Sequence, residues 1–161
     1  MLKLRDVLMP VLCGLLVVLA DVLLFPAPLL VFPAIMISFL IISRGAKKIA
    51  DEVVANRIAT LRAGALFVSF LLGYPIFSSF VDASVRKNAY RFMEEKNKEC
   101  KIKVCEPGVS AGEYLGYRFS YHVTHPDPEG KLDDSNFLIY QQFGLRRILV
   151  NAKSGEERYL D

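Results

Sequence analysis

The chain has 161 residues, of which 53% are hydrophobic and 23% are charged, and its net charge is +3. One domain or two small ones fit this length, the apolar fraction excludes a disordered chain, and the small net charge gives no support for nucleic-acid binding. Residues 1–81 carry seven Lys or Arg and four acidic residues, whereas residues 82–161 carry thirteen of each sign. We therefore predict a membrane domain over residues 1–82 and a soluble α+β domain over residues 83–161.

The first apolar stretch, residues 7–42, contains a single charged side chain, Asp21. One straight helix of this length would measure about 54 Å against a hydrocarbon core of about 30 Å, so the stretch must fold back on itself. The prolines at positions 26 and 28 interrupt a helix and predict a hairpin. Its second arm is short and contains Pro33, so a re-entrant segment is the alternative. The predicted spans are residues 7–25, 28–42 and 63–81.

A cleaved signal peptide is the alternative for the first span, because Lys3 and Arg5 precede it and small residues lie near Ala20. The apolar run continues past Ala20 without a polar start of a mature chain, which disfavours cleavage. Bulky Leu12 before Cys13 likewise disfavours a lipoprotein signal.

The Lys and Arg residues flanking the spans set the expected orientation. Seven of them lie in the N-terminal segment, at Arg44 and in the loop over residues 45–62, which places these segments in the cytoplasm and, after three spans, the C-terminal domain outside it. The loop has apolar residues at helical spacing, so we expect a helical extension or an amphipathic helix at the membrane surface, with a partner-binding helix as the alternative.

Small residues recur every four positions in the third span, at Ala65, Ser69 and Gly73. Such a face lets another helix backbone approach closely. We expect the protein's own hairpin to occupy this face, and oligomerisation is the alternative.

Asp21 is the one ionisable residue within the predicted spans, which makes it a functional candidate by default. It lies near the end of its span, where water is within reach. This position favours a structural role, with a hydrogen bond to a side chain at the end of the third span: Tyr74, Ser78 or Ser79.

The soluble half reads as one helix followed by four antiparallel strands. A helix is predicted over residues 81–97. Strict alternation over residues 114–124 predicts a strand with one core-facing set of side chains: Leu115, Tyr117, Phe119, Tyr121 and Val123. The remaining predicted strands are residues 136–143, 147–151 and 157–160.

Cys100 and Cys105 are the main chemical candidates, because thiols outside the cytoplasm are expected to be oxidised. Five extended steps would separate them by about 16 Å, whereas a disulfide requires Cα atoms within about 7 Å, so residues 101–104 must bend back. We expect a structural disulfide. Free thiols, intermolecular pairing and a redox pair are the alternatives, and the C-x-x-C spacing of redox enzymes is absent.

No motif predicts an enzyme or a cofactor. His122 and His125 are the only histidines and have no third ligand at metal-binding spacing. Ser120, His122 and Asp127 have the residue types of a catalytic triad, but no nucleophile-elbow sequence accompanies them. Glycine motifs for phosphate or dinucleotide binding are also absent.

The polar face of the strands is the best candidate for a partner surface, since arginine and aromatic residues are enriched at interface centres. Its candidate residues are Arg118, His122, Tyr140, Arg146 and Arg147. We predict a non-enzymatic bacterial inner-membrane protein whose periplasmic domain binds a protein, as a toxin-neutralising immunity protein or as an accessory factor of an envelope or secretion complex. The alternative is an oligomeric membrane-intrinsic protein that handles a solute or ion near Asp21. The partner's identity and the oligomeric state stay open.

Overall fold

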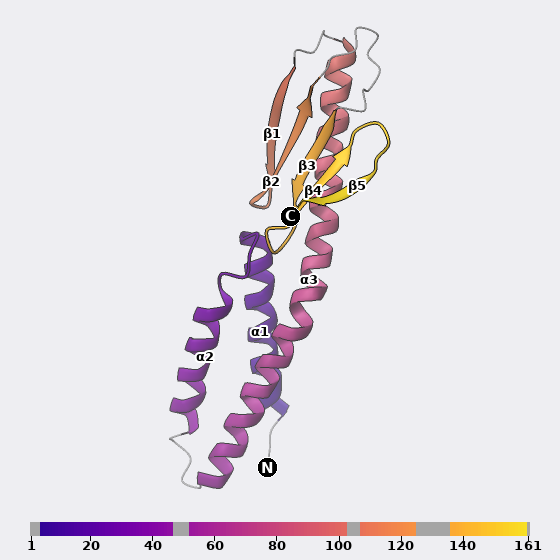
Figure 1. Ribbon diagram of the computed structural model, residues 1–161. Helices are drawn as coiled ribbons and strands as arrows, with labels where there is room; N and C mark the ends of the chain where they lie inside the picture. Colours follow the sequence, from indigo (N-terminus) through magenta and orange to yellow (C-terminus); the bar gives the residue numbers. More distant parts are fainter. Residues whose placement is uncertain (1–3, 47–51, 103–106, 125–135, 161) are drawn as a thin grey trace. The chain divides into compact units, whose positions relative to one another are not determined.

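The computed structural model describes residues 4–46, 52–102, 107–124 and 136–160 (Figure 1). These residues form three helices and one sheet: α1 (Leu4–Leu24), α2 (Val31–Ala46), α3 (Glu52–Ile102), β1 (Gly108–Tyr114), β2 (Tyr117–Val123), β3 (Phe137–Gln141), β4 (Arg147–Asn151) and β5 (Glu157–Leu160). The chain divides into two compact units. The helical unit comprises Met1–Leu23 and Pro28–Ser79, and the sheet unit comprises Leu24–Ala27 and Phe80–Asp161.

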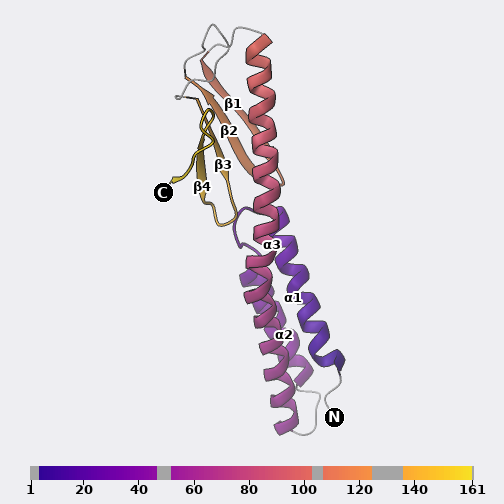
Figure 2. The same ribbon diagram turned by 90° about the vertical axis from the view of Figure 1, so that its right-hand side faces the viewer.

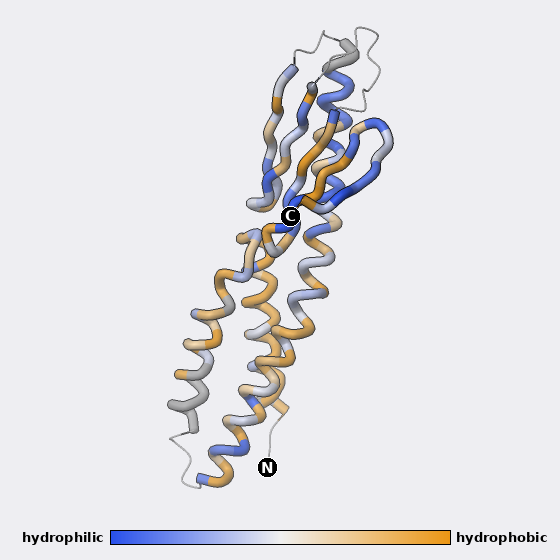
Figure 3. The backbone as a smooth tube through the Cα atoms, viewed as in Figure 1, coloured by the Kyte–Doolittle hydropathy of each residue, from blue (hydrophilic) through white to orange (hydrophobic). Residues whose placement is uncertain are grey.

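The helical unit presents apolar side chains on its surface. Phe32, Met36, Leu71 and Leu72 are each more than half exposed. Figure 3 shows hydrophobic residues along most of α1 and along the first half of α3 beyond its opening turns. Among the described residues, α1 and α3 are long and apolar enough to cross a membrane, judged by length and composition alone.

The structure therefore offers two candidate spanning helices where the sequence predicted three spans. The arm predicted over residues 28–42 is α2, which has 16 residues, fewer than the roughly 20 that a straight span requires. The Pro-rich turn delays its start to Val31. The hairpin itself is confirmed, because α1 ends at Leu24 before the two prolines.

α3 is one continuous helix of 51 residues. The sequence predicted a helical extension or a surface helix over 45–62, a span over 63–81 and a helix that leaves the membrane over 81–97. These segments form one helix because no Pro and Gly stand next to each other between Glu52 and Ile102, and such a pair would end the helix. Pro75 lies inside α3 and lacks an N–H donor, and the Ser79 hydroxyl donates to the Pro75 carbonyl at 2.6 Å.

The sheet unit contains an antiparallel sheet of five strands in the order β1-β2-β3-β4-β5. Figure 2 shows the second half of α3 along one face of this sheet. Val81, Val85, Ala89 and Met93 of α3 are buried at four-residue spacing and form the helix side of the core. The sheet side consists of buried side chains of three strands: Tyr117, Phe119, Tyr121, Leu138, Tyr140, Ile148 and Val150.

The number of strands and the start of the alternating strand differ from the prediction. β1 went undetected because its sequence, Gly-Val-Ser-Ala-Gly-Glu-Tyr, has little apolar alternation. Leu115 and Gly116 both have positive φ, at 52° and 76°, and form the two-residue turn between β1 and β2. Leu115 is therefore 39% exposed in a turn, and the prediction that it faces the core was wrong.

The tight turns of the sheet contact the segment Leu24–Ala27, which belongs to the same unit. The backbone N–H groups of Gly144 and Leu145 donate to the Pro26 carbonyl at 2.8 and 3.2 Å. The Tyr117 hydroxyl donates to the Phe25 carbonyl at 3.4 Å. The Asp82 carboxylate accepts a 2.8 Å hydrogen bond from the Phe143 N–H. These bonds satisfy backbone groups that strand pairing leaves without partners.

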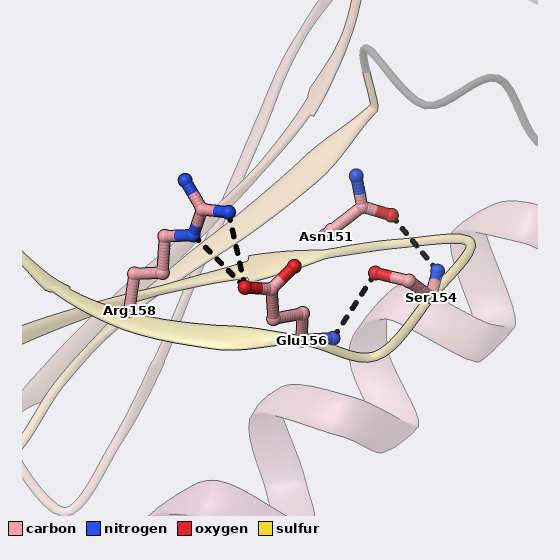
Figure 4. Close-up of polar contacts among 4 residues, drawn as sticks. All are labelled: Asn151, Ser154, Glu156 and Arg158. Atoms are coloured by element: carbon pink, nitrogen blue, oxygen red, sulfur yellow. Dashed lines mark hydrogen bonds and ion pairs between the residues drawn. The ribbon is translucent and has the colours of Figure 1, made fainter.

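The β4–β5 hairpin is closed by side-chain contacts (Figure 4). The Asn151 side-chain oxygen accepts hydrogen bonds from the N–H groups of Lys153 and Ser154 at 2.9 Å each. The Ser154 hydroxyl accepts a bond from the Glu156 N–H at 3.2 Å, and Arg158 forms an ion pair with Glu156 at 3.0 Å. This arrangement confirms the hairpin predicted over residues 147–160.

Candidate functional site

The candidate site is the sheet face opposite α3, here called the outer face. Period-two alternation places the odd-numbered residues of β1, β3 and β4 and the even-numbered residues of β2 on it. The residues form three rows across the sheet. A charged row contains Glu113, Arg118, Gln141 and Arg147; a middle row contains Ala111, Ser120, Ile139 and Leu149; an aromatic row contains Val109, His122 and Phe137.

The outer face is hollowed by an open groove of about 750 Å³ along the charged and middle rows. Its lining includes Arg118, Ser120, Ile139, Gln141 and Arg147. Ser120, Ile139 and Gln141 are half-buried, whereas the two arginines are exposed. The groove thus has a small, partly apolar floor and, along one edge, the charged side chains of Glu113, Arg118 and Arg147.

The side chains of Arg118 and Arg147 form no hydrogen bond or ion pair with any described residue. They lie on β2 and β4, with β3 between them, so their Cα atoms are about 10 Å apart at the usual strand spacing. Glu113 stands directly opposite Arg118 in the β1–β2 register, and its carboxylate forms no bond to a described residue either. The charged row is therefore available to an outside molecule as far as the described chain shows.

The structure places four of the five predicted partner-surface residues at the surface. Arg118 and His122 lie on the outer face, Arg147 lies at the start of β4, and Arg146 is exposed in the turn before it. Tyr140 is fully buried, so its assignment to the partner surface was wrong. On β3, the side chains of Ile139 and Gln141 lie on the outer face, whereas the side chain of Tyr140 between them points toward α3.

Ser120 and His122 are joined by a 3.0 Å hydrogen bond between Oγ and Nε2. The His122 ring stacks on Phe137 with ring centroids 4.5 Å apart. Asp127, the third residue of the Ser/His/Asp set considered from the sequence, lies outside the described residues, as does His125. The Ser120 hydrogen bond and the Phe137 stacking hold the His122 ring in the aromatic row. Within the described chain, no carboxylate contacts the other ring nitrogen of His122.

The inner face carries a polar cluster around Glu157. Its Oε1 atom accepts hydrogen bonds from the hydroxyls of Tyr90 at 2.8 Å and Tyr140 at 3.3 Å, and it forms an ion pair with Arg86 at 3.0 Å. Burial and the Glu157 charge raise the pKa of Tyr140 well above its ordinary value. Since every member bonds to another across α3, β3 and β5, the cluster fastens the helix to the sheet.

Asp21 has an equally complete set of partners within the helical unit. It is fully buried. One carboxylate oxygen accepts hydrogen bonds from the N–H groups of Leu29 and Leu30 at 3.0 Å each, and the other accepts one from the Tyr74 hydroxyl. The predicted bond to Tyr74 is confirmed, whereas Ser79 bonds to the Pro75 carbonyl. Asp21 thereby satisfies amide groups just before α2.

Ser69 and Gly73 of the small-residue face lie against α1. A Cβ atom added to Gly14 would stand 1.9 Å from Ser69 Oγ, and one added to Gly73 would stand 3.3 Å from side-chain atoms of Leu15 and Val18. Ser69 is buried. Ala65 is half-buried on the same helix. The protein's own hairpin thus occupies the positions of Ser69 and Gly73.

The predicted disulfide cannot be placed, because Cys105 and the side chain of Cys100 lie outside the described residues. Cys13 is a free, exposed cysteine. The described residues contain no cluster of three or more His, Cys, Asp or Glu side chains that would hold a metal ion.

No protein-family model, curated protein or solved structure matches this chain.

Proposed function

We propose that this chain is a non-enzymatic membrane protein that binds a protein partner through the outer face of its sheet. The groove bordered by Arg118 and Arg147 is the observation that carries the proposal. In this proposal the helical unit lies in a bacterial inner membrane, the N-terminus is cytoplasmic and the sheet unit is periplasmic. A toxin-neutralising immunity protein and an accessory factor of an envelope or secretion complex both fit this arrangement, and the compact exported domain on its own anchor favours the former.

Exposure of apolar side chains in the helical unit supports the membrane assignment. In the candidate spanning segments of α1 and α3, only 22% and 28% of the most apolar stretch is buried. The core helix of a soluble protein would be mostly covered. The contacts of Gly14 and Asp21 make α1 part of the helical packing, which argues against a signal peptide. Hydrocarbon would cover the exposed apolar surface.

Partner binding is supported by the chemistry of the outer face. α3 covers the inner face with a core of buried side chains, whereas Val109 on the outer face is 63% exposed. Two arginines beside a half-buried apolar row resemble the composition of interface centres. This face therefore offers both apolar area and charge for recognition.

The membrane-intrinsic alternative has less support. Oligomerisation through the third span would require Ser69 and Gly73, which α1 contacts. Handling an ion at Asp21 would require a carboxylate oxygen without partners, but both oxygens accept hydrogen bonds. A buried carboxylate held in this way is better suited to fastening a turn.

Site-specific photo-crosslinking tests the proposal. Benzoylphenylalanine would replace Ser120 in the groove of the full-length chain, and Lys87, which is exposed on α3, would carry it in the matched control. We expect Ser120→benzoylphenylalanine to form a covalent adduct with another protein in native membranes, and the control to form none. Adducts of equal yield from both positions, or from neither, would contradict binding through the outer face.

A further inference from the structure

We propose that the groove on the outer face takes an extended acidic segment of the protein partner, whose carboxylates pair with Arg118 and Arg147 while an apolar side chain contacts Ile139. This inference rests on the proposed function and adds the chemistry of the partner.

The charge of the groove favours an acidic occupant. Arg118 and Arg147 both line the groove, and neither forms an ion pair with a described residue. Arg158, on the neighbouring strand β5, is by contrast paired with Glu156 at 3.0 Å. Glu113 lines the groove as well, so two positive charges and one negative charge leave it with a net charge of +1. Each guanidinium group can bind a carboxylate with two parallel hydrogen bonds.

The spacing of the two arginines favours an extended occupant. The two arginines stand in one row across the sheet, with Gln141 opposite Arg147 on the intervening strand. Their Cα atoms are about 10 Å apart, and alternate side chains of an extended segment are about 7 Å apart. Long arginine side chains close the difference, so carboxylates at positions i and i+2 of an extended segment can contact both arginines.

The floor of the groove favours an apolar side chain in the occupant. Ser120 and Ile139 are register partners in the middle row and are half-buried. Because Ile139 gives this row an apolar side chain beside the small Ser120, we expect the occupant to present an apolar side chain next to its acidic ones. A purely polyanionic occupant would leave this row uncovered.

The probes are fluorescent peptides of alternating Glu and Leu, alternating Gln and Leu, and alternating Lys and Leu. Full-length protein in phosphatidylcholine nanodiscs would be titrated and binding followed by fluorescence anisotropy, with empty nanodiscs as the blank. We expect the Glu-Leu peptide to bind about tenfold more tightly than the Gln-Leu peptide and to lose this advantage at high salt.

Paired variants connect the preference to the groove. Arg118→Gln with Arg147→Gln should abolish the preference for the Glu-Leu peptide, and Arg118→Glu with Arg147→Glu should transfer it to the Lys-Leu peptide. The matched control is Arg91→Glu, an exposed arginine of α3 that forms no bond to a described residue, and it should leave the preference unchanged. Each variant replaces an exposed side chain, and its thermal unfolding would be compared with that of the unaltered chain.

Other outcomes overturn the inference and separate it from the proposed function. If Ile139→Gln weakens both the Glu-Leu and Gln-Leu peptides but the arginine variants change neither, the face binds peptides without preferring acidic ones. If phosphatidylglycerol vesicles bind through Arg118 and Arg147 and the peptides do not, the occupant is a lipid headgroup. If no peptide binds and position 120 forms no protein adduct, the proposed function fails as well.

Discussion

Asp21 is a charged residue whose role follows from its hydrogen bonds. Its carboxylate accepts from two backbone N–H groups, at Leu29 and Leu30, and from the Tyr74 hydroxyl, while the side chain is fully buried. Burial of a carboxylate is costly unless its oxygens are satisfied. The residue therefore fastens the α1–α2 turn and α3 together within the helical unit.

Asp21→Ala should destabilise the helical unit, because it leaves the amide groups of Leu29 and Leu30 without their acceptor, at a cost of about 1–3 kcal/mol. Tyr74→Phe removes one donor only and should cost less. The measurement is the free energy of unfolding of detergent-solubilised protein titrated with sodium dodecyl sulfate. Asp21→Asn is the matched control, since its side-chain oxygen can still accept both amide bonds. Equal stability of the Ala and Asn variants would refute this role.

Asp82 gives a pH-dependent prediction in the sheet unit. Burial raises the pKa of its carboxyl group, and the Phe143 N–H and the Arg146 charge offset part of this rise. A folded-state pKa above the unfolded value of about 3.9 means that the folded protein binds more protons between the two values. The stability contributed by Asp82 is thus fully present below the unfolded pKa and is lost as the pH rises through the folded pKa.

Asp82→Asn keeps an acceptor for the Phe143 N–H and removes the ionisation. We expect the variant to be more stable than the unaltered chain near neutral pH, and the difference to vanish toward about pH 3 as the Asp82 carboxyl group becomes protonated. Chemical unfolding of both proteins over this pH range measures the difference directly. Asp82→Ala, which removes both the acceptor and the ionisation, should be less stable than Asp82→Asn by about 1 kcal/mol at every pH. A stability advantage of the unaltered chain that grows with pH would contradict the predicted sign.

Among the elements, the β1–β2 hairpin contains a local conflict between residue type and conformation. Positive φ at both central turn residues matches a type I′ turn, for which Asn-Gly is preferred. Gly116 suits this conformation, but the φ of 52° at Leu115 is unfavourable for a residue with a bulky side chain.

Leu115→Asn should raise the free energy of unfolding by about 1 kcal/mol, because Asn adopts the left-handed region at lower cost. Gly116→Ala is the opposite test. Its Cβ would stand 3.4 Å from the Leu24 carbonyl, an ordinary contact, so the expected loss of about 1 kcal/mol is conformational. Thermal and denaturant unfolding give both values. A destabilised Leu115→Asn protein would show that contacts of the leucine outweigh the strain.

The packing of α1 against α3 provides the second prediction at the scale of elements. A Cβ atom at Gly14 would stand 1.9 Å from Ser69 Oγ and 3.0 Å from Ser69 Cβ, whereas one at Gly64 would meet nothing within 4 Å. Gly14→Ala should therefore cost about 1–2 kcal/mol through overpacking. Gly64→Ala should leave stability unchanged or slightly raised. Unfolding in sodium dodecyl sulfate compares the two, and equal effects would argue against a close contact at Gly14.

At the scale of the whole molecule, the two units differ in surface chemistry. The helical unit exposes many large apolar side chains, whereas the sheet unit exposes fewer and has an apolar core between α3 and the inner face. In the proposed arrangement the bilayer is the solvent of the first unit and water is the solvent of the second.

Cysteine labelling tests this arrangement. Single cysteines at Lys153 in the β4–β5 turn and at Arg57 in α3 would be introduced into a chain whose native cysteines are replaced by serine. We expect a membrane-impermeant maleimide to label Lys153→Cys, but not Arg57→Cys, in intact spheroplasts, because Arg57 lies among the predicted cytoplasmic positive charges. Labelling of Arg57→Cys alone would reverse the orientation, and the predicted Cys100–Cys105 disulfide would lose its oxidising compartment.

The periodicity of the sequence determined most of the local structure. The apolar run and its prolines located the α1–α2 hairpin, and period-two alternation identified the buried side chains of β2, such as Tyr121. These patterns are readable because they repeat over many residues. β1 lacked such a pattern, and α2 begins three residues later than predicted, at Val31, because the turn takes up the residues before it.

The sequence by itself determined the division into an apolar half and a charge-rich half, since composition alone decides which solvent each half suits. Only the tertiary structure decided what lies across from each residue. It placed Tyr140 in the core and brought Arg118 and Arg147 into one row of the outer face, and it surrounded Asp21 with donors from two separate segments. Strand register and helix contacts join residues far apart in the chain, and no local pattern records those distances.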